Sequence, residues 1–188
     1  MKDSTSEFEN ARKDAKSCKE KFNIVKQKRY DLFFKAFSHV AERIDQIYKE
    51  LTFNETTSSG GTAYLTLENS EEPYLEGIKY HAMPPMKRFR DMEQLSGGEK
   101  TMAALALLFA IHSFHPAPFF VLDEVDAALD NANVSSIANY IMKQSEIVQF
   151  IVVSLKPSFF SFSNSLVGVY KENLESKVLS LDLSVYEE

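Results

Sequence analysis

The chain has 188 residues, of which 44 % are hydrophobic types, including 15 Phe and 8 Tyr. This length and composition predict one globular domain with enough apolar surface to bury a core. The longest apolar run, Met102 to Ile111, is about half as long as a membrane-crossing helix requires, and the charged start excludes a signal peptide. We therefore expect no membrane partner. The single cysteine, Cys18, excludes an internal disulfide and a cysteine-based zinc site, which indicates a reducing compartment.

Charge is unevenly distributed along the chain. Residues 1–29 carry nine Lys or Arg against five Asp or Glu, whereas residues 30–188 carry twelve against twenty-two. A basic helix at the start could contact DNA phosphates, but the solvated surface of a coiled coil has a similar composition. A second basic cluster is either a solubilising loop or a group placed beside phosphates, and it comprises Lys79, Lys87, Arg88 and Arg90. The four histidines lack metal-ligand spacing and are expected to be structural.

The first 51 residues show the three-and-four spacing of a coiled-coil seam. Its first members are Phe8, Ala11, Ala15, Cys18, Phe22 and Val25. The seam then passes through Arg29 and resumes from Phe33 to Leu51 with additional apolar positions. At about 1.5 Å per residue, this pattern predicts roughly 65 Å of helix between Phe8 and Leu51. We expect residues 1–29 to be the end of a coiled coil whose partner helix lies in another segment, so that the chain begins inside a longer protein. Residues 30–188 are expected to form a globular lobe.

The remaining sequence predicts an α/β fold with a mainly parallel sheet. Residues 53–61 form a loop, and short strands are predicted over 62–67 and 74–81. A helix over 97–114 is apolar on every side, which predicts burial in a core. It is followed by a strand over 119–122, an amphipathic helix over 134–142 and a strand over 150–153, an order that predicts parallel pairing. Residues 166–170 and 178–183 alternate about a turn and predict a terminal hairpin.

The first motif is the run from Leu95 to Lys100, Leu-Ser-Gly-Gly-Glu-Lys. Ser96 followed three residues later by Glu99 is a capping box, so one interpretation is a well-started helix. The same geometry also suits an anion, because Gly97 and Gly98 let the backbone approach a ligand and the helix start is positively polarised. A terminal phosphate would fit such a site.

The second motif is an apolar strand that ends in Asp123 and Glu124. Ligands of α/β proteins bind at the carboxyl edge of the sheet, where these two acids are expected to lie. Asp123 suits the Mg²⁺ ion that accompanies nucleotide phosphates, and Glu124 suits the base that orients or deprotonates attacking water. A structural turn with both acids exposed is the alternative. A phosphate-binding loop of the form G-x-x-x-x-G-K-[ST] occurs nowhere in the sequence, so the chain reads as half of an ATPase.

With these motifs the chain resembles the ABC class of ATPases. Residues 95–98 resemble the signature motif, residues 121–124 the Walker B motif and residues 128–130 the D-loop. The preceding coiled coil is typical of the SMC (structural maintenance of chromosomes) family. Longer stretches resemble the first SMC subunit of cohesin, and they are residues 72–77, 87–90, 116–120, 126–131 and 166–170.

This resemblance implies that the chain is the C-terminal lobe of an SMC head, whose N-terminal lobe supplies the Walker A loop. Asp123 and Glu124 would act on ATP and Mg²⁺ held by the same head, with Glu124 as the catalytic base and Asp123 contacting the metal through water. Another set would contact ATP held by the partner head, and it comprises Leu95, Ser96, Gly97, Gly98 and Asp130. Many ABC proteins place a switch histidine where this chain has Leu155, which cannot hydrogen-bond a phosphate.

The resemblance further implies a role in chromosome cohesion and DNA loop organisation in the nucleus, with DNA and a kleisin subunit as partners. The kleisin would dock at the terminal hairpin and residues 159–162. The lobe by itself is expected to be inactive. Two alternatives are a kleisin-docking platform with little catalysis and the head lobe of a related DNA repair ATPase. A transporter ATPase subunit would lack the heptads.

Overall fold

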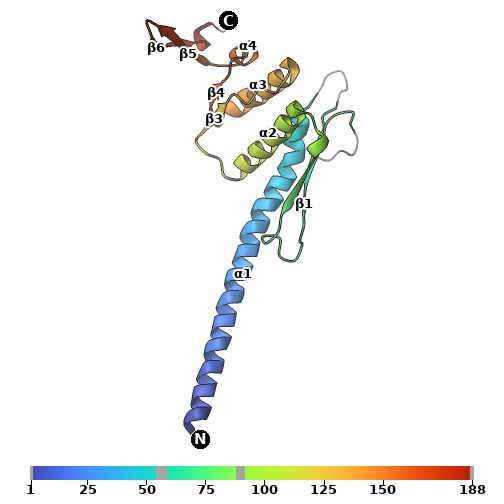
Figure 1. Ribbon diagram of the computed structural model, residues 1–188, viewed down its shortest axis with the longest axis vertical. Helices are drawn as coiled ribbons and strands as arrows, with labels where there is room; N and C mark the ends of the chain where they lie inside the picture. The colour runs from blue at the N-terminus through green and yellow to red at the C-terminus, as the bar shows by residue number, and fades with distance from the viewer. Residues whose placement is uncertain (1, 54–58, 88–91, 187–188) are drawn as a thin grey trace.

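The computed structural model describes residues 2–53, 59–87 and 92–186, and a single long helix dominates its shape (Figure 1). Helix α1 (Lys2–Leu51) has 50 residues and projects far beyond the rest of the chain. Its seam residues Phe8, Phe22 and Val25 are each about two-thirds exposed. The helix predicted from the heptads is confirmed and runs through Arg29 without a break.

The second half of α1 enters the core beside two further helices. Helix α2 (Gly97–Phe114) and helix α3 (Asn131–Ser145) both pack against it (Figure 1). Ile44, Tyr48 and Leu51 of α1 are fully buried there. Helix α2 is less enclosed than its all-apolar sequence predicted, because Leu108 is 41 % exposed and Ile111 is 53 % exposed. Its bounds match the prediction at both ends.

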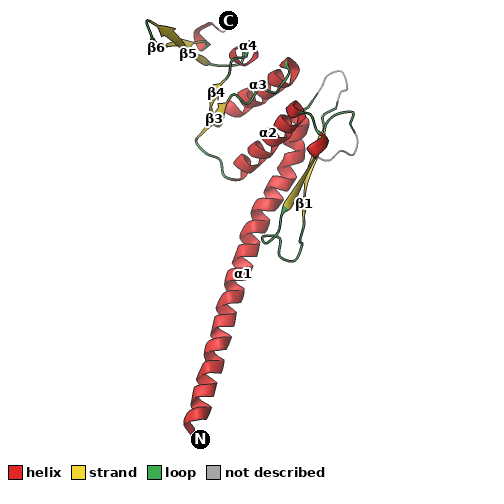
Figure 2. Cartoon of the chain, viewed as in Figure 1, coloured by secondary structure: helices red, strands yellow, loops and turns green. Residues whose placement is uncertain are grey.

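The strands form three separate pairs, coloured yellow in Figure 2. Strands β1 (Thr62–Leu67) and β2 (Ile78–Met83) are antiparallel, as are β5 (Ser165–Glu172) and β6 (Glu175–Asp182). Strands β3 (Phe119–Asp123) and β4 (Gln149–Val153) are parallel and joined by α3. The parallel pairing predicted for the core strands is confirmed, but in the described chain the parallel sheet consists of these two strands alone. Within each hairpin, the chain turns back directly from one strand to the next, which gives antiparallel pairing. Only β3 and β4 are joined by a helical crossover, which parallel pairing needs.

Three short helices complete the described chain, and no described helix is long and apolar enough to cross a membrane. They are η1 (Met92–Gln94), α4 (Pro157–Phe160) and η2 (Ser184–Tyr186). Parts of the predicted 53–61 loop and two members of the second basic cluster, Arg88 and Arg90, lie outside the described residues.

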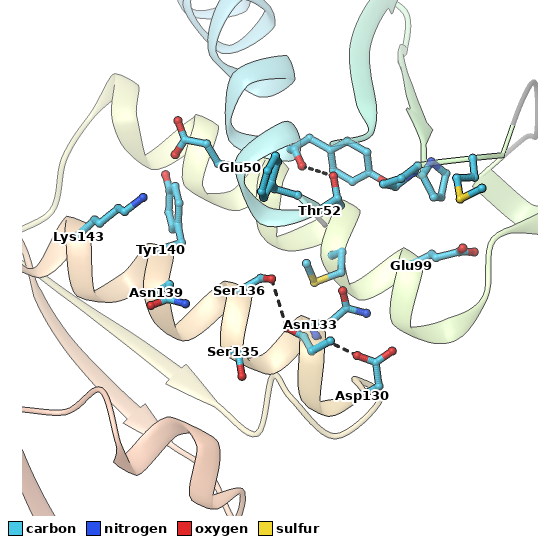
Figure 3. Close-up of a pocket in the computed structure, with 17 residues that line it drawn as sticks. Glu50, Thr52, Glu99, Asp130, Asn133, Ser135, Ser136, Asn139, Tyr140 and Lys143 are labelled. Carbon is cyan, nitrogen blue, oxygen red and sulfur yellow. Dashed lines mark hydrogen bonds between the residues drawn. The ribbon is translucent and has the colours of Figure 1, made fainter. Parts of the chain in front are cut away.

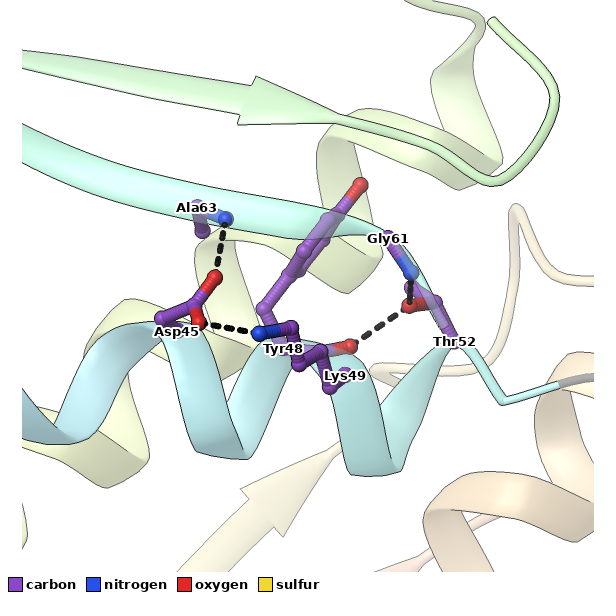
Figure 4. Close-up of polar contacts among 6 residues, drawn as sticks. All are labelled: Asp45, Tyr48, Lys49, Thr52, Gly61 and Ala63. Atoms are coloured by element: carbon purple, nitrogen blue, oxygen red, sulfur yellow. Dashed lines mark hydrogen bonds and ion pairs between the residues drawn. The ribbon is translucent and has the colours of Figure 1, made fainter. Parts of the chain in front are cut away.

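Side-chain contacts fasten the end of α1 to β1 (Figure 4). Asp45 accepts a hydrogen bond from the backbone amide of Ala63 at 3.1 Å and pairs with Lys49 at 2.5 Å. The Thr52 hydroxyl donates to the Tyr48 carbonyl at 2.6 Å and accepts from the Gly61 amide at 2.8 Å. A Cβ at Gly61 would lie 2.6 Å from the Tyr48 ring, so only glycine allows this close crossing.

The connection between β1 and β2, residues 68–77, reaches back to α1 below the core. Lys26 forms an ion pair with Glu72, and the Arg29 guanidinium lies 4.2 Å from the centre of the Tyr74 ring. We call these contacts the clasp. The predicted strand over 74–81 is wrong at its start, because residues 73–75 form a turn and Tyr74 packs against Arg29 instead of pairing. The Glu68 amide donates to the Gly77 carbonyl at 3.1 Å and closes the loop.

Candidate functional site

The first motif forms the start of α2, and the expected capping box is present. The Ser96 hydroxyl accepts a hydrogen bond from the Glu99 amide at 3.3 Å, and the Ser96 amide donates to the Glu99 carboxylate at 2.9 Å. Leu95 is buried and anchors the motif to the core, whereas Ser96 is exposed. A Cβ added at Gly97 would meet no atom within 4 Å, so its backbone faces open space. The helix start is thus capped and still accessible to a ligand on its outer side.

Glu99 also links the motif to the basic cluster. Lys87 donates to its carboxylate at 2.6 Å. Partial burial acts to raise the pKa of Glu99, but the hydrogen bonds from Lys87 and Ser96 prevail and lower it. Lys79 pairs with Glu68 at 3.3 Å. Both described members of the second basic cluster therefore have acidic partners within the chain.

The second motif lies at the carboxyl end of β3, as predicted. Asp123 and Glu124 are both exposed. Glu124 has a φ of 47°, a left-handed conformation that is uncommon outside glycine, and its amide donates to the Val153 carbonyl at 2.9 Å. The acidic pair therefore lies at the edge where the two parallel strands end, and neither carboxylate forms an ion pair with another described residue.

The structure brings the first motif next to the D-loop. A Cβ on Gly98 would lie 3.0 Å from the carbonyl oxygen of Ala128 and 3.8 Å from the Leu129 side chain. Asp130 then caps α3, because its carboxylate accepts a hydrogen bond from the Asn133 amide at 2.9 Å. Two helix starts, α2 and α3, thus meet at one end of the lobe. No described hydrogen bond or ion pair joins Asp123 or Glu124 to the first motif.

An open cleft of about 810 Å³ lies between the end of α1, the start of α2 and one face of α3 (Figure 3). Glu99 and Asp130 contribute to its lining, and Figure 3 shows them on opposite walls. Asp123 and Glu124 are not among its lining residues. Within the described residues, no group of three or more His, Cys, Asp or Glu side chains could hold a metal ion. The two exposed carboxylates of the acidic pair still offer the oxygen ligands that Mg²⁺ prefers.

The sequence did not single out three residues that shape the edge of the lobe where β3 and β4 end. Asp126 is 3 % exposed and accepts a hydrogen bond from the Ser154 hydroxyl at 2.7 Å. The Lys156 ammonium donates to the backbone carbonyl of Leu129. Asp126 lies two residues after the acidic pair, and a third acid so close to it is a signal that the sequence did contain. Nothing in the local pattern signals that Ser154, which lies 28 positions away, is its partner.

Comparison with known proteins identifies the family. The family model described as the RecF/RecN/SMC N terminal domain matches residues 5–177. The chain belongs to the SMC family. That description names an N-terminal domain, so this match does not confirm the C-terminal position that the resemblance implied.

Among curated relatives, Structural maintenance of chromosomes protein 1 of Schizosaccharomyces pombe is 64 % identical over 97 % of this chain. The human protein 1B of the same name is 54 % identical over 99 %. In both cases the chain spans 15 % of the relative's length.

Solved SMC heads share the fold. An Smc head with an extended coiled coil, bound to the C-terminal domain of ScpA and derived from Pyrococcus furiosus, superposes with a TM-score of 0.81. It is 36 % identical, and the match covers 91 % of this chain and 42 % of that one. A second structure, from work on ATP-driven dimerization and DNA-stimulated activation of SMC ATPases, gives a TM-score of 0.72 at 37 % identity. That match covers 82 % of this chain and 90 % of the other. The chain therefore has the α/β fold of an SMC ATPase head with a helix leading into it.

Proposed function

We propose that this chain is the C-terminal lobe of a cohesin-type SMC ATPase head, with residues 1–29 as the end of the coiled coil and residues 30–188 as the lobe. The observation that carries the proposal is that one lobe holds two separate motifs, each of which suits part of a nucleotide site. The acidic pair lies at the end of β3, and an accessible helix start lies at α2. The sequence has no loop to hold the phosphates between them.

One uncovered sheet face supports the need for a complementary lobe. Parallel strands are normally covered on both faces. Here α2 and α3 cover one face of the β3–β4 pair, while the side chains of the other face are about half exposed. They are Phe119, Val121, Ile151 and Val153. A second lobe that carries the Walker A loop would bury this face and supply the missing phosphate contacts.

In the assembled head, Asp123 would hold Mg²⁺ through water, and the metal would supply charge neutralisation at the phosphates. Glu124 would accept a proton from attacking water at its carboxylate. Leu155 is 85 % exposed at the position of the switch histidine and has no polar group to offer, so hydrolysis would depend on Glu124.

The other half-site would serve ATP bound to the partner head. The amides of Gly97 and Gly98 would face its terminal phosphate beside the exposed Ser96, with Leu95 fixing the motif and Asp130 contacting the nucleotide from the D-loop. Two nucleotides would join two heads, and hydrolysis would release them. We extend this to a role in chromosome cohesion and DNA loop organisation in the nucleus. The related structure from work on ATP-driven dimerization and DNA-stimulated activation of SMC ATPases supports the ATP-dependent joining of two heads.

A docking role for the terminal hairpin is compatible with the same proposal. Strands β5 and β6 expose several apolar side chains, and the four most exposed on the strands are Val167, Val169, Val178 and Leu179. The Pyrococcus head was solved with the C-terminal domain of ScpA bound, which supports a kleisin partner for the lobe, while its position at the hairpin rests on these exposed side chains. If docking were the main function, the acidic pair would be dispensable.

The test compares Glu124→Gln with the wild type in the assembled pair of full-length heads. The variant keeps the shape of the side chain and leaves Asp123 for the metal, but it removes the base. Hydrolysis should fall by about 10²- to 10⁴-fold while ATP still joins the heads. Calorimetry on the 188-residue chain alone should detect no tight ATP binding. Hydrolysis at the wild-type rate in the variant would refute the role of Glu124 and favour a docking platform.

A further inference from the structure

Two segments that follow β3 and β4 are fastened to each other through a buried carboxylate. We call residues 123–130 the acidic segment and residues 153–156 the strap. Asp126, in the acidic segment, is the one charged side chain among the described residues that is buried. A buried carboxylate is costly unless hydrogen bonds satisfy it. The Ser154 hydroxyl of the strap donates to its Oδ2 atom at 2.7 Å.

The Ser154 hydroxyl is held in one orientation. Its oxygen accepts a hydrogen bond from the Lys156 amide at 2.9 Å, which leaves its proton for Asp126. The Lys156 ammonium then returns to the acidic segment and donates to the Leu129 carbonyl. The strap therefore contacts the acidic segment on both sides of Ala127 and Ala128.

The same hydrogen bonds extend to two of the residues in the proposed nucleotide sites, Glu124 and Asp130. The Glu124 amide donates to the strap at Val153, and the Glu124 carbonyl accepts from the Ala127 amide at 3.2 Å. The Asp126 carbonyl accepts from the Leu129 amide at 3.0 Å, one residue before the cap of α3. These two hydrogen-bonded turns connect Glu124 at one end of the acidic segment to Leu129, the neighbour of Asp130, at the other.

Glu124 needs this support because its backbone is strained. Its φ of 47° persists in a non-glycine residue only where the surroundings impose it. We infer that Ser154, acting through Asp126, is a positioning residue that holds the Glu124 carboxylate for hydrolysis and links it to Asp130. This inference rests on the proposed function of the head. Neither residue touches a reacting atom, so its effect should fall on the rate and not on ATP affinity.

The test uses the full-length protein in its two-head complex and compares Ser154→Ala with Ser154→Thr. Alanine removes the hydroxyl, and kcat should fall about 10- to 100-fold, as expected when a catalytic group is misplaced, with the KM for ATP within about twofold of wild type. Threonine keeps the hydroxyl and should restore most of the rate. Ser145→Ala is the matched control, because among the described residues the Ser145 hydroxyl bonds only to the Met142 carbonyl within α3. It should leave kcat unchanged.

A second variant, at the other contact of the strap, distinguishes loss of positioning from a folding defect. Lys156→Met removes the other strap contact, and it should also lower kcat without raising KM. If both variants lower the melting temperature but the folded protein keeps its wild-type kcat, the inference is wrong. Loss of hydrolysis in Glu124→Gln together with an unchanged rate in Ser154→Ala would overturn only the inference and leave the proposed function standing. If the wild-type complex hydrolyses no ATP, both fail.

Discussion

Replacing Ser96 separates a helix cap from a contact with the partner head. In the structure the Ser96 side chain contributes one hydrogen bond, from the Glu99 amide, and that bond is long at 3.3 Å. The reciprocal bond of the capping box uses the Ser96 backbone amide and survives any side-chain replacement. Ser96→Ala and Ser96→Arg therefore lose the same single interaction within the chain.

The expected loss of stability follows from that one bond. Losing an N-cap side chain costs about 1 kcal/mol, which lowers the melting temperature of a domain of this size by about 2–4 °C. Both variants should show this shift. Arginine adds a large side chain at an exposed position where the partner's phosphate would lie, so only Ser96→Arg should abolish ATP-dependent pairing.

The assay combines thermal melting with light scattering of full-length heads with and without ATP. ATP binding to the head's own site should survive in both variants, because Ser96 lies in the half-site assigned to the partner's nucleotide. Normal pairing by Ser96→Arg would show that the motif is a helix cap and not a phosphate contact between heads. Equal loss of pairing in Ser96→Ala would show that the cap, not the added bulk, is responsible.

Two further predictions concern the core and the clasp. Phe109→Ala should lower the free energy of unfolding by about 3–5 kcal/mol in urea titrations, because the ring is 4 % exposed and three aromatic rings lie 4.9 to 6.3 Å from its centre. Phe109→Leu, which keeps most of the volume, should cost less than about 1.5 kcal/mol. The clasp should depend on pH. The hydrogen bond between Lys26 and Glu72 lowers the pKa of Glu72 from its ordinary 4.5 and raises that of Lys26 from 10.5. The contribution of this ion pair to stability is therefore fully present between pH 4.5 and pH 10.5. It is lost as the pH falls through the lowered pKa of Glu72, and also as the pH rises through the raised pKa of Lys26. Hydrogen exchange of residues 71–76, relative to the strands, should rise on both sides, and Glu72→Gln should abolish the acidic limb. A flat profile would show that the ion pair does not hold the loop.

Local sequence signals determined the elements that are specified by residues close to one another in the chain. The capping box and apolar run located α2 at both ends, and the heptads predicted the single helix α1. The strand–helix–strand order predicted that β3 and β4 are parallel. Hydrophobic periodicity and helix caps act within a few residues, so they can be read without knowing the fold. Both halves of the candidate site, at Ser96 and at Glu124, were found in this way.

Only the tertiary structure decided which distant groups meet. The sequence did not show that Tyr74 leaves the predicted strand to pack on Arg29, 45 positions earlier, or that Gly98 lies against Ala128. Nor did it show that Asp126 is buried beneath Ser154. Such contacts depend on how α1, α2 and the β3–β4 pair dock on one another, and docking is selected by the packing of whole faces instead of by any local pattern. Tertiary packing also decides why one face of the β3–β4 pair is exposed. The continuous apolar sequence of these strands predicts burial on both faces, but the described chain covers only the face that packs on α2 and α3.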